Sequence, residues 1–133
     1  MNKDDLKKRL KLLAIKIARL CQKIPNALIN PVYIGQLVRS SSSSASNYRA
    51  ACRGKSKADF INKLKIVEEE LDETMFFYEM IAEFNAEFKD ELRELYKEAD
   101  ELLSIIVASI NTANRNVAGT NPKSKITNQK SNA

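Results

Sequence analysis

Carboxylates and thiols are the side chains of this sequence that could take part in catalysis. Glu69 and Glu73 are four residues apart, so a helix would place them one turn from each other as a pair for acid–base work. The sequence contains no histidine, which removes the commonest general base and the usual zinc ligand, and it contains no glycine-rich phosphate loop. Because no catalytic set is complete, we predict that the protein is not an enzyme and holds no cofactor and no metal. Cys21 and Cys52 form no Cys-x-x-Cys motif and are interpreted as structural thiols, with a redox or metal role as the alternative.

The basic side chains indicate a different chemistry, the binding of anions. Residues 1–58 hold 13 Lys/Arg and 2 Asp/Glu, a net charge of +11. Residues 59–101 hold 5 Lys/Arg and 15 Asp/Glu, a net charge of −10, and residues 102–133 hold 4 Lys/Arg and no acidic residue. Such segregation is typical either of a nucleic-acid-binding surface or of basic helices that pack beside acidic ones.

Guanidinium groups and hydroxyls suit phosphate oxygens, and helical spacing places Arg39, Arg49 and Arg53 on one outward face with Ser46. The candidate nucleic-acid-binding residues are Arg39, Arg49, Arg53, Lys55, Lys57, Lys8, Lys16, Arg19 and Lys23. Binding through phosphates would be largely independent of sequence and would weaken steeply with salt. The alternative is that the arginines pair with carboxylates of the third or fourth helix or of a neighbouring subunit.

Apolar residues at helical spacing predict the elements that position these side chains. In the first segment they are Leu6, Leu10, Leu13, Ile17, Leu20 and Ile24. This pattern predicts a helix from about Asp4 to Lys23, which ends before Pro25. The third helix is predicted from Ser56, which forms a capping box with Asp59, to about residue 84.

The serine run at residues 40–44 would be a flexible linker by composition. A helical face centred on Leu37 nevertheless includes Ile34, Ser41, Tyr48 and Cys52. We therefore predict that the run lies inside the second helix, where small side chains let a neighbouring helix approach closely.

The fourth helix is predicted over roughly residues 87–117, after a break at Asn85. Residues 1–118 then form one all-α domain, an antiparallel up-down-up-down four-helix bundle, and the polar, basic residues 119–133 form a disordered tail. Apolar residues such as Phe76 and Phe77 exceed what one seam can bury, which predicts self-association. No stretch approaches the ~20 apolar residues of a membrane span, so we expect no membrane partner and a cytoplasmic location.

Four short motifs lie in residues 35–77: Gln36-Leu37-x-Arg39-Ser40, Asn47-Tyr48-Arg49-Ala50, Ser56-Lys57-x-x-Phe60 and Glu69-x-x-x-Glu73-Thr74. With these motifs the sequence resembles the bacterial four-helix bundle proteins, also called the 23S rRNA intervening-sequence protein family. The resemblance covers the second and third helices, about a third of the chain. The first and fourth helices carry no distinctive motif, and the serine run is richer in serine than the family's usual mix of Ala, Ser and Ile.

The resemblance implies an antiparallel bundle that assembles into a ring-like homopentamer and has no known enzymatic activity. A related protein, the accessory variability determinant of diversity-generating retroelements, is a basic ring that binds nucleic acid and a reverse transcriptase. The partners implied for this chain are therefore further copies of itself, RNA or DNA, and a reverse transcriptase or another protein.

Two functions follow as hypotheses. The first is a non-catalytic, homo-oligomeric bundle that binds nucleic acid mainly through backbone phosphates, with the basic faces of the first two helices. The alternative is a protein-interaction scaffold of unknown partner, in which the charge segregation serves subunit assembly. Under the second hypothesis Phe76 and Phe77 would dock a partner protein, whereas under the first they would lie between subunits.

Overall fold

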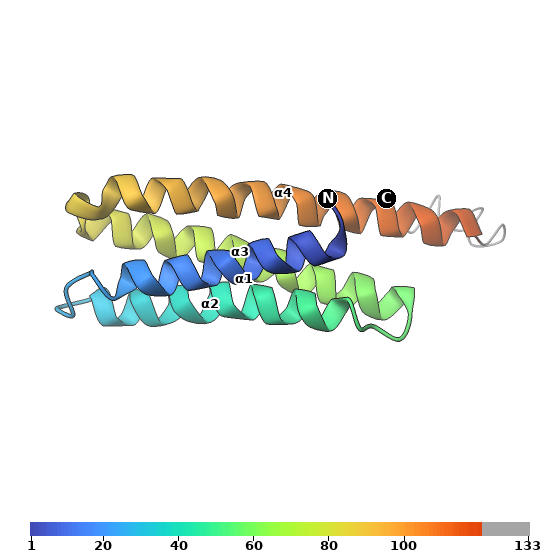
Figure 1. The fold of residues 1–133 in the computed structure, drawn as a ribbon, viewed down its shortest axis with the longest axis horizontal. Helices are drawn as coiled ribbons and strands as arrows, with labels where there is room; N and C mark the ends of the chain where they lie inside the picture. Colours follow the sequence, from blue (N-terminus) through green and yellow to red (C-terminus); the bar gives the residue numbers. More distant parts are fainter. Residues whose placement is uncertain (121–133) are drawn as a thin grey trace.

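The computed structural model describes the backbone of residues 1–120 and the side chains of residues 1–116. Residues 1–120 contain four α-helices and no strand, which confirms the predicted all-α class. The helices are α1 (Lys3–Cys21), α2 (Asn30–Ala51), α3 (Lys57–Phe84) and α4 (Lys89–Thr120), with a short 3₁₀ turn (Ala86–Phe88) before α4. They lie side by side along the long axis of the molecule (Figure 1). The predicted tail lies outside the described residues, apart from Gly119 and Thr120 at the end of α4.

Each helix packs against two neighbours, because α2 contacts α1 and α3, and α4 contacts α3 and α1. Ion pairs show how α1 and α4 run past each other. Arg9 bonds to Glu98 and Glu101, whereas Lys23 bonds to Glu91, so residue numbers fall along α4 as they rise along α1. Because each helix contacts two others, the four helices form a square in cross-section with four outer faces, and the α1/α2 face lies opposite the α3/α4 face.

The predicted apolar stripe of α1 forms one side of the core. Its six residues, from Leu6 to Ile24, are each at most 4% exposed. The stripes of the other helices meet it at Leu37, Leu71 and Leu102, which are fully buried. Burial of one such side chain stabilises the fold by about 1.5–3 kcal/mol, so the shared core dominates the stability of the bundle. None of the helices described here has the length and apolar composition needed to cross a membrane.

The serine run is helical, as predicted. Ser40, Ser41 and Ser44 are fully buried, and each donates its hydroxyl to a carbonyl oxygen three residues earlier in α2 at 2.7–3.3 Å. The hydroxyl oxygen of Thr74 in α3 lies 2.9 Å from the hydroxyl oxygen of Ser40. Because these small side chains satisfy their polar groups within the two helices, α3 approaches α2 closely without leaving unpaired donors at this contact.

Two asparagines join the two connections at one end of the bundle. The Asn30 amide donates to Asn85 Oδ1 at 2.9 Å, and the Asn85 amide donates to Asn30 Oδ1 at 2.8 Å and to the Ile81 carbonyl at 2.9 Å. Both residues are buried. The break expected at Asn85 is present, and its physical role is to tie the end of α3 to the start of α2.

Candidate nucleic-acid interface

A groove between α1 and α2 has a basic rim and a floor of small side chains. It encloses about 470 Å³. Lys7, Lys8 and Lys11 of α1 and Arg49 of α2 line it as its charged residues. Its other described lining residues are Ala14, Ile15, Ala18, Ser42, Ala45 and Ser46. No acidic side chain is among the described residues that line this groove.

Helical geometry explains why these cations share one face. The buried stripe of α1 leaves Lys8 and Lys11 exposed, and both of them line the groove beside α2. On α2, Arg49 follows the buried Tyr48, and the exposed Arg53 lies in the turn just after the helix ends at Ala51. We refer to Lys8, Lys11, Arg49 and Arg53 as the basic face.

The four cations of the basic face are exposed and unpaired within the part of the chain that the structure describes. None of their nitrogens lies within 4.0 Å of a carboxylate oxygen of these residues. The neighbouring Lys7 differs, because its ammonium lies 3.2 Å from Asp4 Oδ1. The basic face thus presents free positive charge to solvent, which is the condition for binding an external anion.

Arg39 does not belong to this face, in contrast to the sequence-based expectation. Its guanidinium contacts Glu73 at 2.6 Å and Glu70 at 3.2 Å, so α2 and α3 are linked by an ion pair within the chain. Burial acts to raise the pKa of Glu70, but its polar neighbours, among them the Ser43 hydroxyl and the Arg39 guanidinium, outweigh burial and lower that pKa. The alternative considered for the arginines, pairing with the third helix, therefore holds for Arg39.

Three further predicted cations, Lys16, Arg19 and Lys23, lie outside the groove. Lys23 pairs with Glu91 at 3.3 Å. Lys16 lies seven residues from both Arg9 and Lys23, so two helical turns place it on the α4 side of α1. Lys16 and Arg19 are exposed, but neither lines the groove between α1 and α2. Lys16 and Lys23 are therefore separate from the basic face, whereas Arg19, three turns after Lys8 on the same side of α1, lies beyond the groove.

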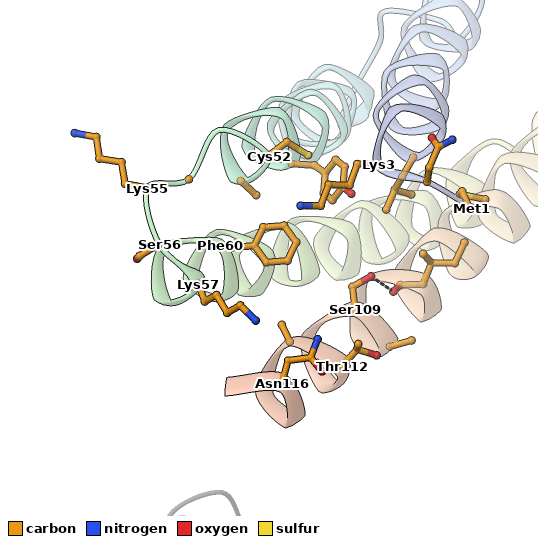
Figure 2. Close-up of a pocket in the computed structure, with 18 residues that line it drawn as sticks. Met1, Lys3, Cys52, Lys55, Ser56, Lys57, Phe60, Ser109, Thr112 and Asn116 are labelled. Carbon is orange, nitrogen blue, oxygen red and sulfur yellow. Dashed lines mark hydrogen bonds between the residues drawn. The ribbon is translucent and has the colours of Figure 1, made fainter. Parts of the chain in front are cut away.

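Lys55 and Lys57 line a second cavity, at the end of the bundle where α2 is connected to α3 (Figure 2). Ser56 lies between them and caps α3 as predicted, since its hydroxyl accepts from the Asp59 amide at 3.1 Å. Cys52 also lines this cavity. The predicted site is thus divided between the basic face and this cavity, which we call the end cavity.

Lys7 and Lys11 line the groove but were not among the residues selected from the sequence. The signal for Lys11 was present, because Lys8 and Lys11 are three residues apart and adjacent on a helix surface. What the sequence did not contain was the rotation of α1 about its axis relative to α2, which decides which lysines face the groove.

The α3/α4 face has the opposite charge. Glu68, Glu69 and Asp72 outnumber Lys65 in the lining of a groove of about 430 Å³, whose apolar side chains include Leu103 and Val107. Glu73, which helical spacing places one turn from Glu69, is bound to Arg39. The neighbouring Glu70 carboxyl group is the largest influence that raises the pKa of Glu73. Glu69 therefore belongs to the acidic groove, whereas Glu73 belongs to the ion pair between α2 and α3.

The two cysteines are free thiols in different surroundings. Cys21 is buried in the core, and burial raises the pKa of its thiol to about 11. Cys52 is half-buried at the end cavity. A raised pKa leaves little thiolate at neutral pH, so Cys21 fits the structural interpretation.

Comparison with known proteins agrees with the fold. The family described as 23S rRNA-intervening sequence protein matches residues 3–108. A crystal structure of a protein with unknown function, from the S23 ribosomal protein family of Bacteroides thetaiotaomicron, is 26% identical in sequence with a TM-score of 0.73. The match covers 84% of this chain and 99% of that one. No curated protein matches the chain. Because the family match spans most of its length, the chain belongs to the 23S rRNA-intervening sequence protein family.

Proposed function

We propose that this protein is a non-catalytic homo-oligomer that binds nucleic acid through backbone phosphates on its basic face. One observation carries the proposal. Lys8, Lys11 and Arg49 line the α1/α2 groove, and Arg53 follows the end of α2. None of the four has a carboxylate within 4.0 Å among the described residues, whereas Arg39 and Lys23 are paired within the chain. Free cations on one face suit a polyanion, because release of its counterions favours binding.

The rest of the surface supports a directed interaction. Glu68, Glu69 and Asp72 on the opposite face repel a polyanion, so the charge distribution orients it toward α1 and α2. The small residues of the groove floor, such as Ala14 and Ala45, let a phosphate backbone approach between the basic side chains. Phosphate contacts of this kind position a nucleic acid without reading its sequence.

An aromatic patch supports the oligomeric part of the proposal. Tyr33 of α2 stacks on Phe84 with 6.1 Å between ring centroids and also packs against Phe77, while Phe76 packs edge-on to Phe77 at 5.2 Å. Phe76 and Phe84 are 53% and 54% exposed. A cluster of exposed aromatic rings is typical of a surface that another protein covers. We place the contact between copies here, on α2 and α3, which leaves the basic face open.

The assembly that we propose is the ring-like homopentamer implied by the family resemblance, built from antiparallel up-down-up-down subunits. The opposite order of residues in the α1/α4 ion pairs supports the antiparallel arrangement. A ring repeats the basic face, so several weak phosphate contacts add through avidity. The affinity for a long nucleic acid then exceeds that for a short one.

Binding of fluorescent single-stranded RNA and double-stranded DNA, measured by anisotropy at low and moderate salt, tests the proposal. The double variant Lys11→Glu/Arg49→Glu should lose affinity by more than about tenfold, and the slope of log affinity against log salt should fall by about 1 for each cation removed. Lys97→Glu on exposed α4 is the charge control and should change affinity by less than about twofold. Equal losses in both variants, or none in either, would disprove a site on the basic face.

The scaffold function remains the second candidate, because the two opposite faces are complementary. The α3/α4 groove has an acidic rim and apolar lining residues, whereas the α1/α2 groove has a basic rim and a floor of small side chains. Copies joined through these faces would use the charge segregation for assembly, and a reverse transcriptase or another protein would be the further partner. Light scattering separates the candidates, since oligomers held by these faces dissociate as salt rises, whereas those held by the aromatic patch persist.

A further inference from the structure

The end cavity is a hollow at one end of the bundle and shares no lining residue with the groove of the basic face. It is open to solvent and has a volume of about 760 Å³ between the start of α1, the end of α2, the start of α3 and the last described turns of α4. Figure 2 shows Phe60 in the middle of the cavity, with Lys3 on the α1 side and Lys57 at the start of α3. Its volume lies within the range of small-molecule sites, roughly 300–1,000 Å³.

The interior of the end cavity is apolar. Leu6, Tyr48, Phe60 and Ile105 line it from four different helices. Figure 2 shows that Ser109, which also lines the cavity, makes a hydrogen bond within the set of residues drawn, and this bond joins its hydroxyl to the Ile105 carbonyl at 2.9 Å. The Ser109 hydroxyl is therefore already engaged, while the polar side chains of Asn2, Thr112 and Asn116 lie elsewhere on the lining and leave the part formed by Leu6, Phe60 and Ile105 apolar.

The charged groups of the cavity are all positive. Lys3, Lys55 and Lys57 line it, and no acidic residue is among its described lining residues. The Lys3 ammonium lies 4.5 Å from the centre of the Phe60 ring, so a positive charge is held directly over the apolar interior. An apolar interior with cations at its edge is complementary to a ligand that has an apolar body and an anionic head.

We propose that the end cavity binds a small anionic amphiphile, with an acyl chain or a single ring inside and a phosphate or carboxylate head at Lys3 and Lys57. The chain's own C-terminal residues 121–133 fit the cavity poorly by composition, because they contain three lysines and no acidic residue. The positive rim would repel them. The same argument disfavours a basic protein segment, whereas an anionic head gains charge-assisted contacts.

Titration of the full chain with octyl phosphate and with octanol, followed by amide NMR, tests this proposal. Octyl phosphate should shift the amide signals of Gly54, Ser109 and Thr112 and should bind at least about tenfold more tightly than octanol, since the two probes differ only in the head group. It should also slow the alkylation of Cys52, which lines the cavity. Equal affinities for the two probes, or shifts confined to the aromatic patch, would overturn the proposal.

Two variants distinguish the effect of the lysine charges on ligand binding from the effect of the cavity volume. Lys3→Glu/Lys57→Glu should abolish the preference for octyl phosphate; each lysine is the first residue of its helix, where glutamate is favourable, so folding should persist. Thr112→Phe, at an exposed position on the cavity wall, should abolish binding of both probes. Retention of octyl phosphate binding by both variants would show that the ligand lies elsewhere.

A control and a competing ligand complete the design. Lys11→Glu, on the basic face, should keep octyl phosphate binding, so a failure of the nucleic-acid proposal and a failure of this one are distinguishable. Adenosine monophosphate provides a test of ligand class. If it bound more tightly than octyl phosphate, the end cavity would be a nucleotide site and the amphiphile proposal would be wrong.

Discussion

Among single residues, Arg39 and Arg49 of α2 differ in whether carboxylates surround them. Both are exposed and both were candidates for phosphate binding, yet Arg39 bonds to Glu70 and Glu73 whereas Arg49 lines a groove without carboxylates. An arginine held by two carboxylates has little charge left to offer a phosphate. The two positions therefore differ in role: Arg39 holds α2 against α3, whereas Arg49 is available for the nucleic-acid binding that we propose.

Arg39→Gln should leave nucleic-acid affinity within about twofold and lower the free energy of unfolding by no more than about 1 kcal/mol, because the pair is exposed to solvent. The pKa of Glu70 is lowered in the fold, so this carboxylate stabilises the protein above its unfolded-state pKa, and the contribution is lost as the pH falls through the folded-state value. Urea unfolding of the parent and Arg39→Gln should therefore differ at neutral pH and converge in acid. A large loss of RNA binding would contradict this role.

Among the helices, α2 has the least usual sequence, because a run of five serines lies at its centre. Periodicity was sufficient to predict this helix, since Leu37 and Tyr48 fix one buried face on either side of the run. Ser44 is fully buried on that face and Ser42 is exposed, although both belong to the same run. The close contact of α2 with α3 should therefore need a small side chain at the buried position 44 but not at the exposed position 42, and this can be tested.

Ser44→Leu should lower the free energy of unfolding by about 1–3 kcal/mol, because a larger side chain in a packed contact forces the helices apart. Ser42→Leu introduces the same side chain at an exposed position of the same helix and should change stability by less than about 0.5 kcal/mol. Urea unfolding followed by circular dichroism measures both. Equal effects of the two variants would mean that Ser44 does not lie against another helix.

The order and burial of the helices could be predicted from the sequence, whereas the candidate site could be predicted only in part. Apolar spacing shows which side of each helix is buried, and it correctly gave the core of α1 and the end of α3 at Phe84. It does not show the rotation and offset between neighbouring helices. Arg39 meeting Glu70, Asn30 meeting Asn85, and Lys11 lining the groove all depend on that offset, so they appear only in three dimensions.

The whole molecule separates its charges by face. The basic face lies on α1 and α2, the acidic groove lies on α3 and α4, and the aromatic patch lies on α2 and α3. Three surfaces on different parts of one bundle allow assembly and binding to occur together. The proposed oligomer should then affect nucleic-acid binding through avidity alone, without any change in the basic face of a single subunit.

Phe76→Ser/Phe84→Ser should convert the oligomer into monomers, as measured by light scattering, because it removes the exposed rings of the aromatic patch while changing little of the core. Leu12→Ser is the matched control, since Leu12 is 47% exposed on α1 outside the patch, and it should leave the oligomer intact. The monomeric variant should bind a short oligonucleotide as the parent does but lose affinity for a long RNA, because it cannot engage several phosphate segments at once. If the monomer held long RNA as tightly as the parent, repetition of the basic face would contribute nothing, and binding would belong to a single subunit.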